Sequence, residues 1–300
     1  MSLSVVGPWA KDKLDRLRRY LEAYATILSK QRWCQGFHYI DAFAGPGIHE
    51  VRSARKRLSP VEDLFLGAAD YLHESEEQRQ FLSGSPRVAL EISHPFSTYT
   101  FVEKSPERVV ELENLQGEFK RSRKIGIRQT DCTAFLRDRV AKSENVDWGT
   151  NRAVVFLDPF GMQVGWPTIE LLAKTKAIEV FVNFPVGMAI QRLLLRSGEF
   201  TDTQRKKLDE YFGSDEWFKE IYKKRKADLF GDEPIEKVEK SGERLAKWYR
   251  DRLAKVFGHA SKAALIRNTK GGHLYYLMLA SPNSTGTKIA NHILGAGEYV

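Results

Sequence analysis

The sequence has few cysteines and no long apolar segment. Two of its 300 residues are cysteines, Cys34 and Cys132, so a disulfide framework or a cysteine-rich zinc site cannot be built from it. Its apolar runs fall short of the ~20 residues that a membrane-spanning helix needs, and the N-terminal segment lacks the apolar core of a signal peptide. The seven histidines show no metal-ligand spacing. We therefore expect a globular, cytoplasmic protein with two free thiols, no metal site and no membrane partner.

Acidic side chains are in the minority. Forty-seven Lys and Arg residues stand against 39 Asp and Glu residues, which gives a formal net charge of +8. Such a balance favours polyanionic partners. Most of the positive charge is interleaved with acids, but three clusters are almost purely basic, at residues 52–57, 120–124 and 223–226. Each of them is either a solvated surface or a phosphate contact. Nucleic acid is the large partner that we expect.

The hydrophobic pattern alternates between strands and helices. Predicted strands cover residues 37–43, 98–103, 125–129, 153–157 and 178–182, and helical periodicity covers residues 9–31, 106–115 and 239–257. This alternation predicts an α/β fold with a doubly wound, mostly parallel, Rossmann-like sheet. Two further strands, at residues 263–267 and 274–279, are joined through Gly271-Gly272, which predicts a C-terminal antiparallel hairpin.

Two stretches exceed the minimal alternating unit. Residues 48–97 and 187–258 are predicted to be mainly helical insertions. No Gly, Ser or Pro-rich linker separates a second unit, so we expect residues 1–300 to form one domain.

The first glycine-containing turn follows a predicted strand. Residues 39–47 read Tyr-Ile-Asp-Ala-Phe-Ala-Gly-Pro-Gly, so an acid ends the strand and a Gly-x-Gly turn lets a charged ligand approach the backbone. An NAD or FAD loop needs a third glycine, where this chain has an acid. The pattern Asp-x-Phe-x-Gly-x-Gly is instead typical of S-adenosylmethionine enzymes. We expect Asp41, Phe43, Gly45 and Gly47 to bind that cofactor; a turn without a ligand is the alternative.

Acidic residues also end the next two predicted strands. Glu103 is placed to accept both ribose hydroxyls of an adenosine, and Asp131 to meet an adenine amino group. Their simpler interpretations are a surface carboxylate capping the next helix and a plain helix cap. Cys132, next to Asp131, is included among the cofactor-side residues, although a small buried thiol is its simpler interpretation.

The fourth and fifth predicted strands end in polar and aromatic residues. Asp158, Pro159 and Phe160 follow the fourth strand, and Asn183 stands at the end of the fifth. A planar amine needs an acceptor to position it, and an unstacked base needs an aromatic face. We expect these four residues to form the substrate side of the site. The alternatives are a chain turn with Phe160 in the core and a buried Asn that satisfies a loop.

Several segments carry a family resemblance. They are YIDAFAGPG at residues 39–47, GSPRVALE at 84–91, FVEKSPER at 101–108, FLDPFG at 156–161, NFPVGM at 183–188, YYLMLAS at 275–281 and KIANHIL at 288–294, together with the helix that precedes the first of them. The chain resembles the three-Cys-motif partner protein family over most of its length. That family resembles class I S-adenosylmethionine-dependent methyltransferases and is encoded beside a three-cysteine-motif protein that looks like a radical-SAM enzyme.

The resemblance implies roles for the residues above. Asp41, Gly45 and Gly47 match the cofactor motif, Glu103 the ribose acid, Asp131 the adenine-side acid, and Asp158-Pro159-Phe160 the substrate motif. Methyltransferases acting on base amino groups typically show Asp-Pro-Pro-Tyr or Asn-Pro-Pro-Phe, whereas this chain has Asp-Pro-Phe-Gly. The resemblance therefore does not name an exocyclic amine as the target.

Three functions compete at this stage. The first is an S-adenosylmethionine-dependent methyltransferase acting on a nucleic acid together with the three-cysteine-motif protein. The second is a cofactor-binding or non-catalytic scaffold partner of that protein. The third is an NAD-dependent oxidoreductase, which the missing third glycine disfavours.

Overall fold

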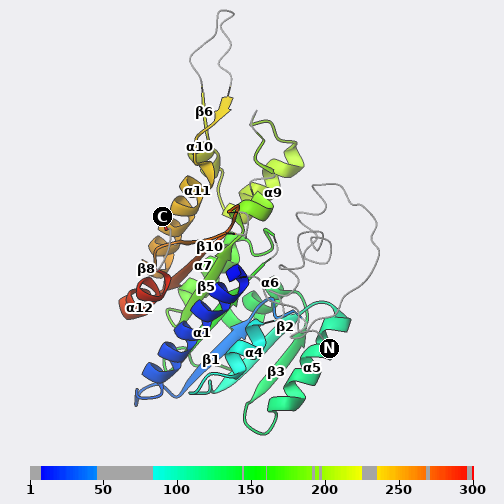
Figure 1. The fold of residues 1–300 in the computed structure, drawn as a ribbon, viewed down its shortest axis with the longest axis vertical. Coiled ribbons are helices and arrows are strands. Elements are labelled where there is room, and N and C mark those ends of the chain that lie inside the picture. The colour runs from blue at the N-terminus through cyan, green and yellow to red at the C-terminus, as the bar shows by residue number, and fades with distance from the viewer. Residues whose placement is uncertain are drawn as a thin grey trace, which may run out of the picture.

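The fold is built around one mixed sheet (Figure 1). The computed structural model describes residues 8–45, 84–143, 145–159, 161–190, 193–195, 198–224, 235–267, 271–295 and 299–300. The eight strands of this sheet are β1 Gly36–Asp41, β2 Thr98–Glu103, β3 Ile125–Gln129, β4 Asn151–Leu157, β5 Ile178–Phe184, β8 His259–Ala260, β9 Ala264–Arg267 and β10 His273–Ser281. Their order is β3-β2-β1-β4-β5-β10-β8, with β9 also paired to β10.

Strands β1 to β5 are parallel to their neighbours, and β10 runs antiparallel to β5. The apolar runs of β4 and β5 are buried on both faces, as expected of central parallel strands. Strands β9 and β10 form the antiparallel hairpin that the sequence predicts. The α/β class and the mostly parallel sheet are therefore confirmed, and the arrangement is compatible with a Rossmann-like fold.

Helices cover both faces of the sheet. One face packs against α1 Pro8–Leu28, α4 Ser85–Leu90, α5 Pro106–Phe119 and α12 Ser284–Leu294. The other packs against α6 Cys132–Phe135, the π-helix η1 Leu136–Ala141, α7 Trp166–Lys174 and α11 Ser241–Phe257. We call the first the α1 face and the second the α11 face. None of the described helices combines the length and the apolar character needed to cross a membrane.

Helix α1 buries one stripe of side chains. Leu17, Leu21 and Tyr24 recur at three- and four-residue steps and pack on the α1 face. Lys13 lies four residues before Leu17, so it falls on the same stripe, and its side chain is completely buried. A charged residue thus points from α1 toward the sheet.

The second predicted insertion is not wholly helical. Residues 187–258 contain most of the π-helix η2 Val186–Ile190, α9 Asp202–Phe212, α10 Trp217–Ile221 and α11. They also contain a two-stranded antiparallel sheet of β6 Tyr222–Lys224 and β7 Ile235–Lys237, which the mainly helical prediction did not include. Three-residue strands are too short to show a period of two in the sequence. The pair is joined across the strands by an ion pair between Lys223 and Glu236 at 2.9 Å.

The first predicted insertion is described only at its end. Residues 84–97 include α4, which packs against α1 and β1. Residues 48–83, with the helices predicted for them and the basic cluster at 52–57, lie outside the described residues.

Candidate functional site

Three neighbouring strands bring polar side chains together at their carboxyl ends. Asp41 is the last residue of β1, Asp158 directly follows β4, and Asn183 is the penultimate residue of β5. In register, Asp41 pairs with Phe156 two residues before Asp158. The three polar residues are at most 5% exposed. The structure therefore gathers three of the predicted site residues at one buried edge of the sheet.

A buried lysine completes this group. The Lys13 Nζ lies 2.5 Å from Asp158 Oδ2, so the ammonium and the carboxylate form a buried ion pair. The same Nζ lies 5.8 Å from the ring centroid of Phe156 and 5.6 Å from that of Tyr275. Burial lowers the pKa of Lys13 to about 8, against the opposing effects of Asp158 and Asp41. Sequence reasoning missed Lys13, although its position on the apolar stripe of α1 was a signal.

Asn183 is held by the other oxygen of the same carboxylate. Its Nδ2 donates a hydrogen bond of 2.6 Å to Asp158 Oδ1. The amide cannot be turned over, because its carbonyl oxygen would then face the carboxylate. The Asn183 Oδ1 is buried, and no partner accounts for it among the described residues. A ligand with a hydrogen-bond donor would satisfy this atom.

Asp41 is the second buried carboxyl. It accepts hydrogen bonds of 3.3 Å from the Phe43 backbone N–H and from the Tyr39 hydroxyl. Burial raises the pKa of Asp41 to about 7, and the charge of Asp158 adds to that rise. Near neutral pH the Asp41 carboxyl is therefore only partly ionised. A cationic group brought next to it would favour the ionised form.

Glu103 holds the turn that follows β1. Gly45 adopts a left-handed backbone with φ of 63°, which favours glycine, and its N–H donates to Glu103 Oε2 over 3.1 Å. The backbone N–H groups of Lys104 and Ser105 each donate to Glu103 Oε1 over 2.8 Å. Glu103 is 9% exposed, so it is not the surface carboxylate that the simpler interpretation describes. Its contact with ribose remains a prediction.

Asp131 and Cys132 follow β3. The Asp131 carboxylate accepts a hydrogen bond of 3.0 Å from the Ala134 N–H and caps α6. Cys132 is packed in the core of the α11 face, and burial raises the pKa of its thiol to about 12. The helix cap and the small buried thiol are thus both present, and the proposed cofactor roles of these two residues remain predictions.

The other predicted site residues divide into two groups. Phe43 is half-buried against the core of the α11 face, and Pro159 is buried directly after Asp158. Gly47 and Phe160 lie outside the described residues.

Two hollows open on the described surface, and both are separate from the buried group. One, of about 660 Å³, lies between the β2–β3 edge and the helices that follow Asp131. Its lining residues are Thr100, Arg128, Thr130, Ala134, Phe135, Asp138 and Arg139. The other, of about 410 Å³, lies along α11. Its lining residues are Glu220, Arg244, Lys247, Trp248, Asp251, Arg252 and Lys255.

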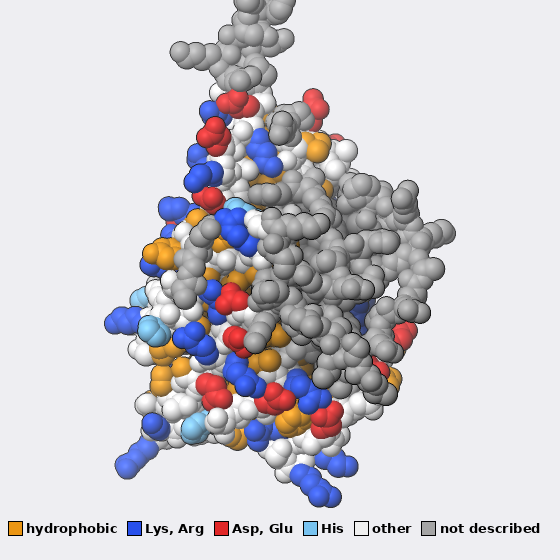
Figure 2. All heavy atoms as spheres, viewed as in Figure 1, with side chains coloured by type: hydrophobic (Ala, Val, Ile, Leu, Met, Phe, Trp, Pro, Cys, Tyr) orange, Lys and Arg blue, Asp and Glu red, His pale blue; other side chains and the backbone are white. Residues whose placement is uncertain are grey.

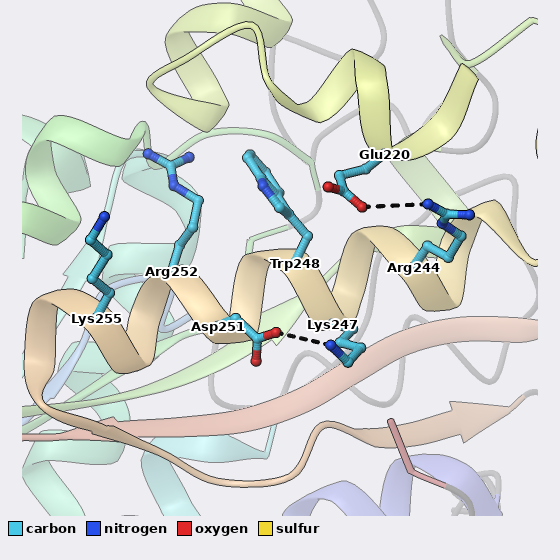
Figure 3. Close-up of a pocket in the computed structure, with 7 residues that line it drawn as sticks. All are labelled: Glu220, Arg244, Lys247, Trp248, Asp251, Arg252 and Lys255. Atoms are coloured by element: carbon cyan, nitrogen blue, oxygen red, sulfur yellow. Dashed lines mark hydrogen bonds and ion pairs between the residues drawn. The ribbon is translucent and has the colours of Figure 1, made fainter. Parts of the chain in front are cut away.

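The second hollow, which we call the α11 surface, carries four cations around one indole (Figure 3). Arg252 lies over two rings, with its guanidinium carbon 3.9 Å from the centroid of Trp166 and 4.8 Å from that of Trp248. Lys247 is 3.2 Å from Asp251 and Arg244 is 3.8 Å from Glu220, and both pairs are largely exposed. Solvent-exposed pairs of this kind contribute little energy and are open to exchange with other anions.

The basic cluster at residues 120–124 does not share the edge of the buried group. It joins the end of α5 to the start of β3, whereas Asp41 and Asp158 lie at the ends of strands parallel to β3. Arg123 also donates hydrogen bonds to the Leu90 and Ile92 carbonyls, so part of the cluster is structural. On the face drawn in Figure 2, Lys and Arg side chains are mixed with acidic ones.

Comparisons with known proteins add little. No family model matches the sequence. No curated protein matches it either. The chain is similar to a solved structure, that of protein LPL1258 of Legionella pneumophila strain Philadelphia 1, described with the family model DUF519. The TM-score is 0.47 and the identity 13%, over 96% of this chain and 91% of that one. This similarity is too distant to indicate an activity or a ligand.

Proposed function

We propose that the protein is an S-adenosylmethionine-dependent methyltransferase whose site is the buried group at the ends of β1, β4 and β5. The observation that carries the proposal is an incomplete polar cluster: two carboxyls, one ammonium and a buried amide oxygen without a described partner. Ligands of open α/β sheets bind at the carboxyl ends of the strands, where this cluster lies. Buried polar groups are normally satisfied, so an incomplete set supports a ligand.

The residues present fit that cofactor. Asp41, which is buried and only partly ionised, would face the cationic part of the ligand, and the left-handed Gly45 would let the ligand approach the backbone. Glu103 would receive the ribose hydroxyls beside this turn. When bound, S-adenosylmethionine supplies a methyl group on a positively charged sulfur, which a nucleophile can take.

The chain's own residues would mainly position the methyl acceptor and exclude water. Lys13, Asp158 and Asn183 are held by short hydrogen bonds on rigid strands and a helix, so they can fix the direction of an incoming acceptor. Burial of the group keeps water away from the reacting atoms. Asp158 balances the charge of Lys13, so the pair adds no net charge to the site.

Membership of the three-Cys-motif partner family, with a three-cysteine-motif radical-SAM-like protein as partner, belongs to the same proposal. It is supported by the motifs at residues 39–47, 101–108, 156–161 and 183–188 and by the antiparallel β10 beside β5, where the class I methyltransferase type was expected to have a C-terminal antiparallel strand.

Nucleic acid is the acceptor that we propose. The α11 surface supports it, because its cations suit phosphates and a half-buried indole, an aromatic face for a base, lies among them. A non-catalytic partner protein is the second candidate. It is favoured by the fact that both oxygens of Asp158 already have partners within the chain.

Calorimetric titration with S-adenosylhomocysteine tests the cofactor proposal. We expect one binding site, and we expect Glu103→Gln to weaken it by about tenfold to a hundredfold, because an amide cannot replace a charged acceptor. Glu118→Gln is the control, since Glu118 pairs with Arg87 at the surface. Absence of heat with S-adenosylhomocysteine and S-adenosylmethionine, together with clear binding of NAD, would overturn the proposal.

Labelled methyl transfer to total nucleic acid separates the enzyme from the scaffold. The protein is assayed alone and with its three-cysteine-motif partner. Transfer above background supports the enzyme. A protein that binds S-adenosylhomocysteine but gives only background transfer in both cases supports the scaffold.

A further inference from the structure

The amide of Asn183 has one orientation and one open position. Its Nδ2 is committed to Asp158 Oδ1, so its Oδ1 must point away from the carboxylate. That oxygen is completely buried and lacks a partner among the described residues. Leaving a buried acceptor without a donor is costly, so the open position indicates a donor that arrives with a ligand.

Asp158 is less suitable than Asn183 to accept a hydrogen bond from that ligand. Lys13 occupies its Oδ2 and Asn183 its Oδ1, and its side chain is 7% exposed. Protonating this carboxylate would leave the buried ammonium of Lys13 without its counter-charge. The Lys13 Nζ also lies over the rings of Phe156 and Tyr275.

We propose that Asn183 Oδ1 receives an N–H of the methyl acceptor, and that Lys13 and Asp158 are positioning residues that hold the amide in this orientation. This inference rests on the proposed function and goes beyond it in naming the atom that meets the acceptor and the class of the reacting atom. The chain is thereby assigned to N-methylation.

Nitrogen fits this site better than oxygen. An alcohol acceptor needs a base as it attacks. The carboxylate bonded to Asn183, Asp158, is locked in an ion pair, and the second carboxyl, Asp41, is assigned to the cationic part of the cofactor. A nitrogen can attack first and lose its proton afterwards. Its lone pair forms the new N–C bond, the electrons of the C–S bond remain on sulfur, and the N–H proton is lost to bulk water when the methylated product leaves the buried group. Asn183 needs only to accept the hydrogen bond that aims the nitrogen.

Four variants test the assignment in labelled methyl transfer from S-adenosylmethionine to total RNA and sheared DNA. They are Asn183→Leu, Asp158→Asn, Lys13→Met and the double variant Lys13→Met with Asp158→Asn. Asn114→Leu is the control, since Asn114 is exposed on α5. We expect Asn183→Leu to lower kcat by at least about a hundredfold, with S-adenosylhomocysteine affinity within about threefold of wild type.

The double variant separates positioning from direct contact. Each single variant leaves one buried charge unpaired, so both lose transfer. The double variant removes both charges, so neither is left unpaired. The new amide at residue 158 can still accept a hydrogen bond from Asn183 Nδ2. We expect its transfer to return to within about tenfold of wild type. Transfer that stays as low as in Asp158→Asn, in a folded double variant that binds S-adenosylhomocysteine, would overturn the positioning role.

The product and the apo protein give two further readouts. Mass spectrometry of the digested nucleic acid should find the label on nitrogen; label on carbon or on the ribose 2′-oxygen would overturn the assignment. In the protein without ligand, NMR of [13Cε]lysine should show the Lys13 signal titrating at lower pH in Asp158→Asn than in wild type, and unchanged in Asn114→Leu. An unchanged Lys13 titration in Asp158→Asn would contradict the ion pair between Lys13 and Asp158.

Failure of the proposed function is a different result. A wild-type protein that binds neither S-adenosylhomocysteine nor S-adenosylmethionine would refute the cofactor. Wild-type transfer that Asn183→Leu leaves intact would refute only the role of Asn183.

Discussion

Helix α1 touches buried carboxylates at both ends of the sheet, and the two contacts differ in kind. Near the start of β5, Glu179 accepts hydrogen bonds from the Tyr20 hydroxyl and, over 2.7 Å, from the Ser281 Oγ. Beyond the end of β4, Asp158 is met by the Lys13 ammonium and the Asn183 amide. Each carboxylate is almost fully buried, and each links the helix to the sheet.

The group formed by Glu179, Tyr20 and Ser281 is complete. Its donors are neutral hydroxyls, both carboxylate oxygens are used, and burial raises the pKa of Glu179. The Asp158 group contains a cation, a second carboxyl nearby at Asp41 and an amide oxygen without a described partner. A complete set of partners is what a structural tie needs, and an incomplete one indicates a place for a ligand.

Removing the cation should have the largest effect on stability. Lys13→Met leaves the Asp158 carboxylate buried without its counter-charge, and we expect the free energy of unfolding to fall by about 3–5 kcal/mol. Urea denaturation measures it. In Lys247→Met the lost partner belongs to an exposed pair, so the change should stay within about 0.5 kcal/mol. Equal losses of stability in the two variants would mean that the buried Lys13–Asp158 pair contributes no more than the exposed Lys247–Asp251 pair.

The pH dependence of stability should follow Asp41. The folded protein keeps the Asp41 proton up to about pH 7, whereas the unfolded chain releases it near the ordinary pKa of an aspartate, 3.8. Raising the pH from 5 to 7 therefore favours the unfolded chain, by up to about 1.4 kcal/mol per pH unit from this group. Denaturation of wild type and Asp41→Asn at both pH values should show this contribution lost in the variant. A variant that keeps the full wild-type slope would contradict the assignment.

Disturbing the complete group should cost stability but not binding. Glu179→Leu leaves the Tyr20 and Ser281 hydroxyls without their acceptor, and we expect a loss of about 2 kcal/mol. The affinity for S-adenosylhomocysteine should stay within about twofold of wild type. Glu179→Gln, which keeps an acceptor, should cost less. A large loss of affinity in a folded Glu179→Leu protein would erase the distinction between the two groups.

The smallest effect is expected at the α11 surface. Trp248→Ala should weaken binding of a single-stranded RNA of about 16 nucleotides by about fivefold, or about 1 kcal/mol, because a stacking platform is lost. Lys247→Gln should flatten the dependence of affinity on salt, and Lys288→Gln, an exposed change on α12, should leave it unaltered. Fluorescence anisotropy measures all three. Salt-independent binding would exclude a phosphate contact at this surface.

Much of the sheet edge could be predicted from sequence. Strands β2 and β3 have their predicted bounds, and Asp41, Asp158 and Asn183 meet because the ends of adjacent parallel strands must meet. These inferences rest on local sequence patterns and on one rule of sheet topology, which is why the structure agrees with them.

What could not be predicted depends on tertiary contacts. Lys13 is one of several basic residues in α1, and the apolar stripe alone does not tell which carboxylate its side chain will reach. The open Oδ1 of Asn183 follows from an amide orientation that only its neighbour fixes. The β6–β7 pair was missed because its strands are too short to show periodicity.

The most direct test of the contrast between the two groups is a crystal structure of the protein with S-adenosylhomocysteine. Our account predicts the ligand at the ends of β1, β2 and β4, in contact with Asp41, the Gly45 turn and Glu103, with Asn183 Oδ1 facing the acceptor side. The Tyr20, Glu179 and Ser281 contacts should be unchanged. A ligand bound elsewhere would contradict it. So would a complex in which the ligand contacts none of the buried group of Lys13, Asp41, Asp158 and Asn183.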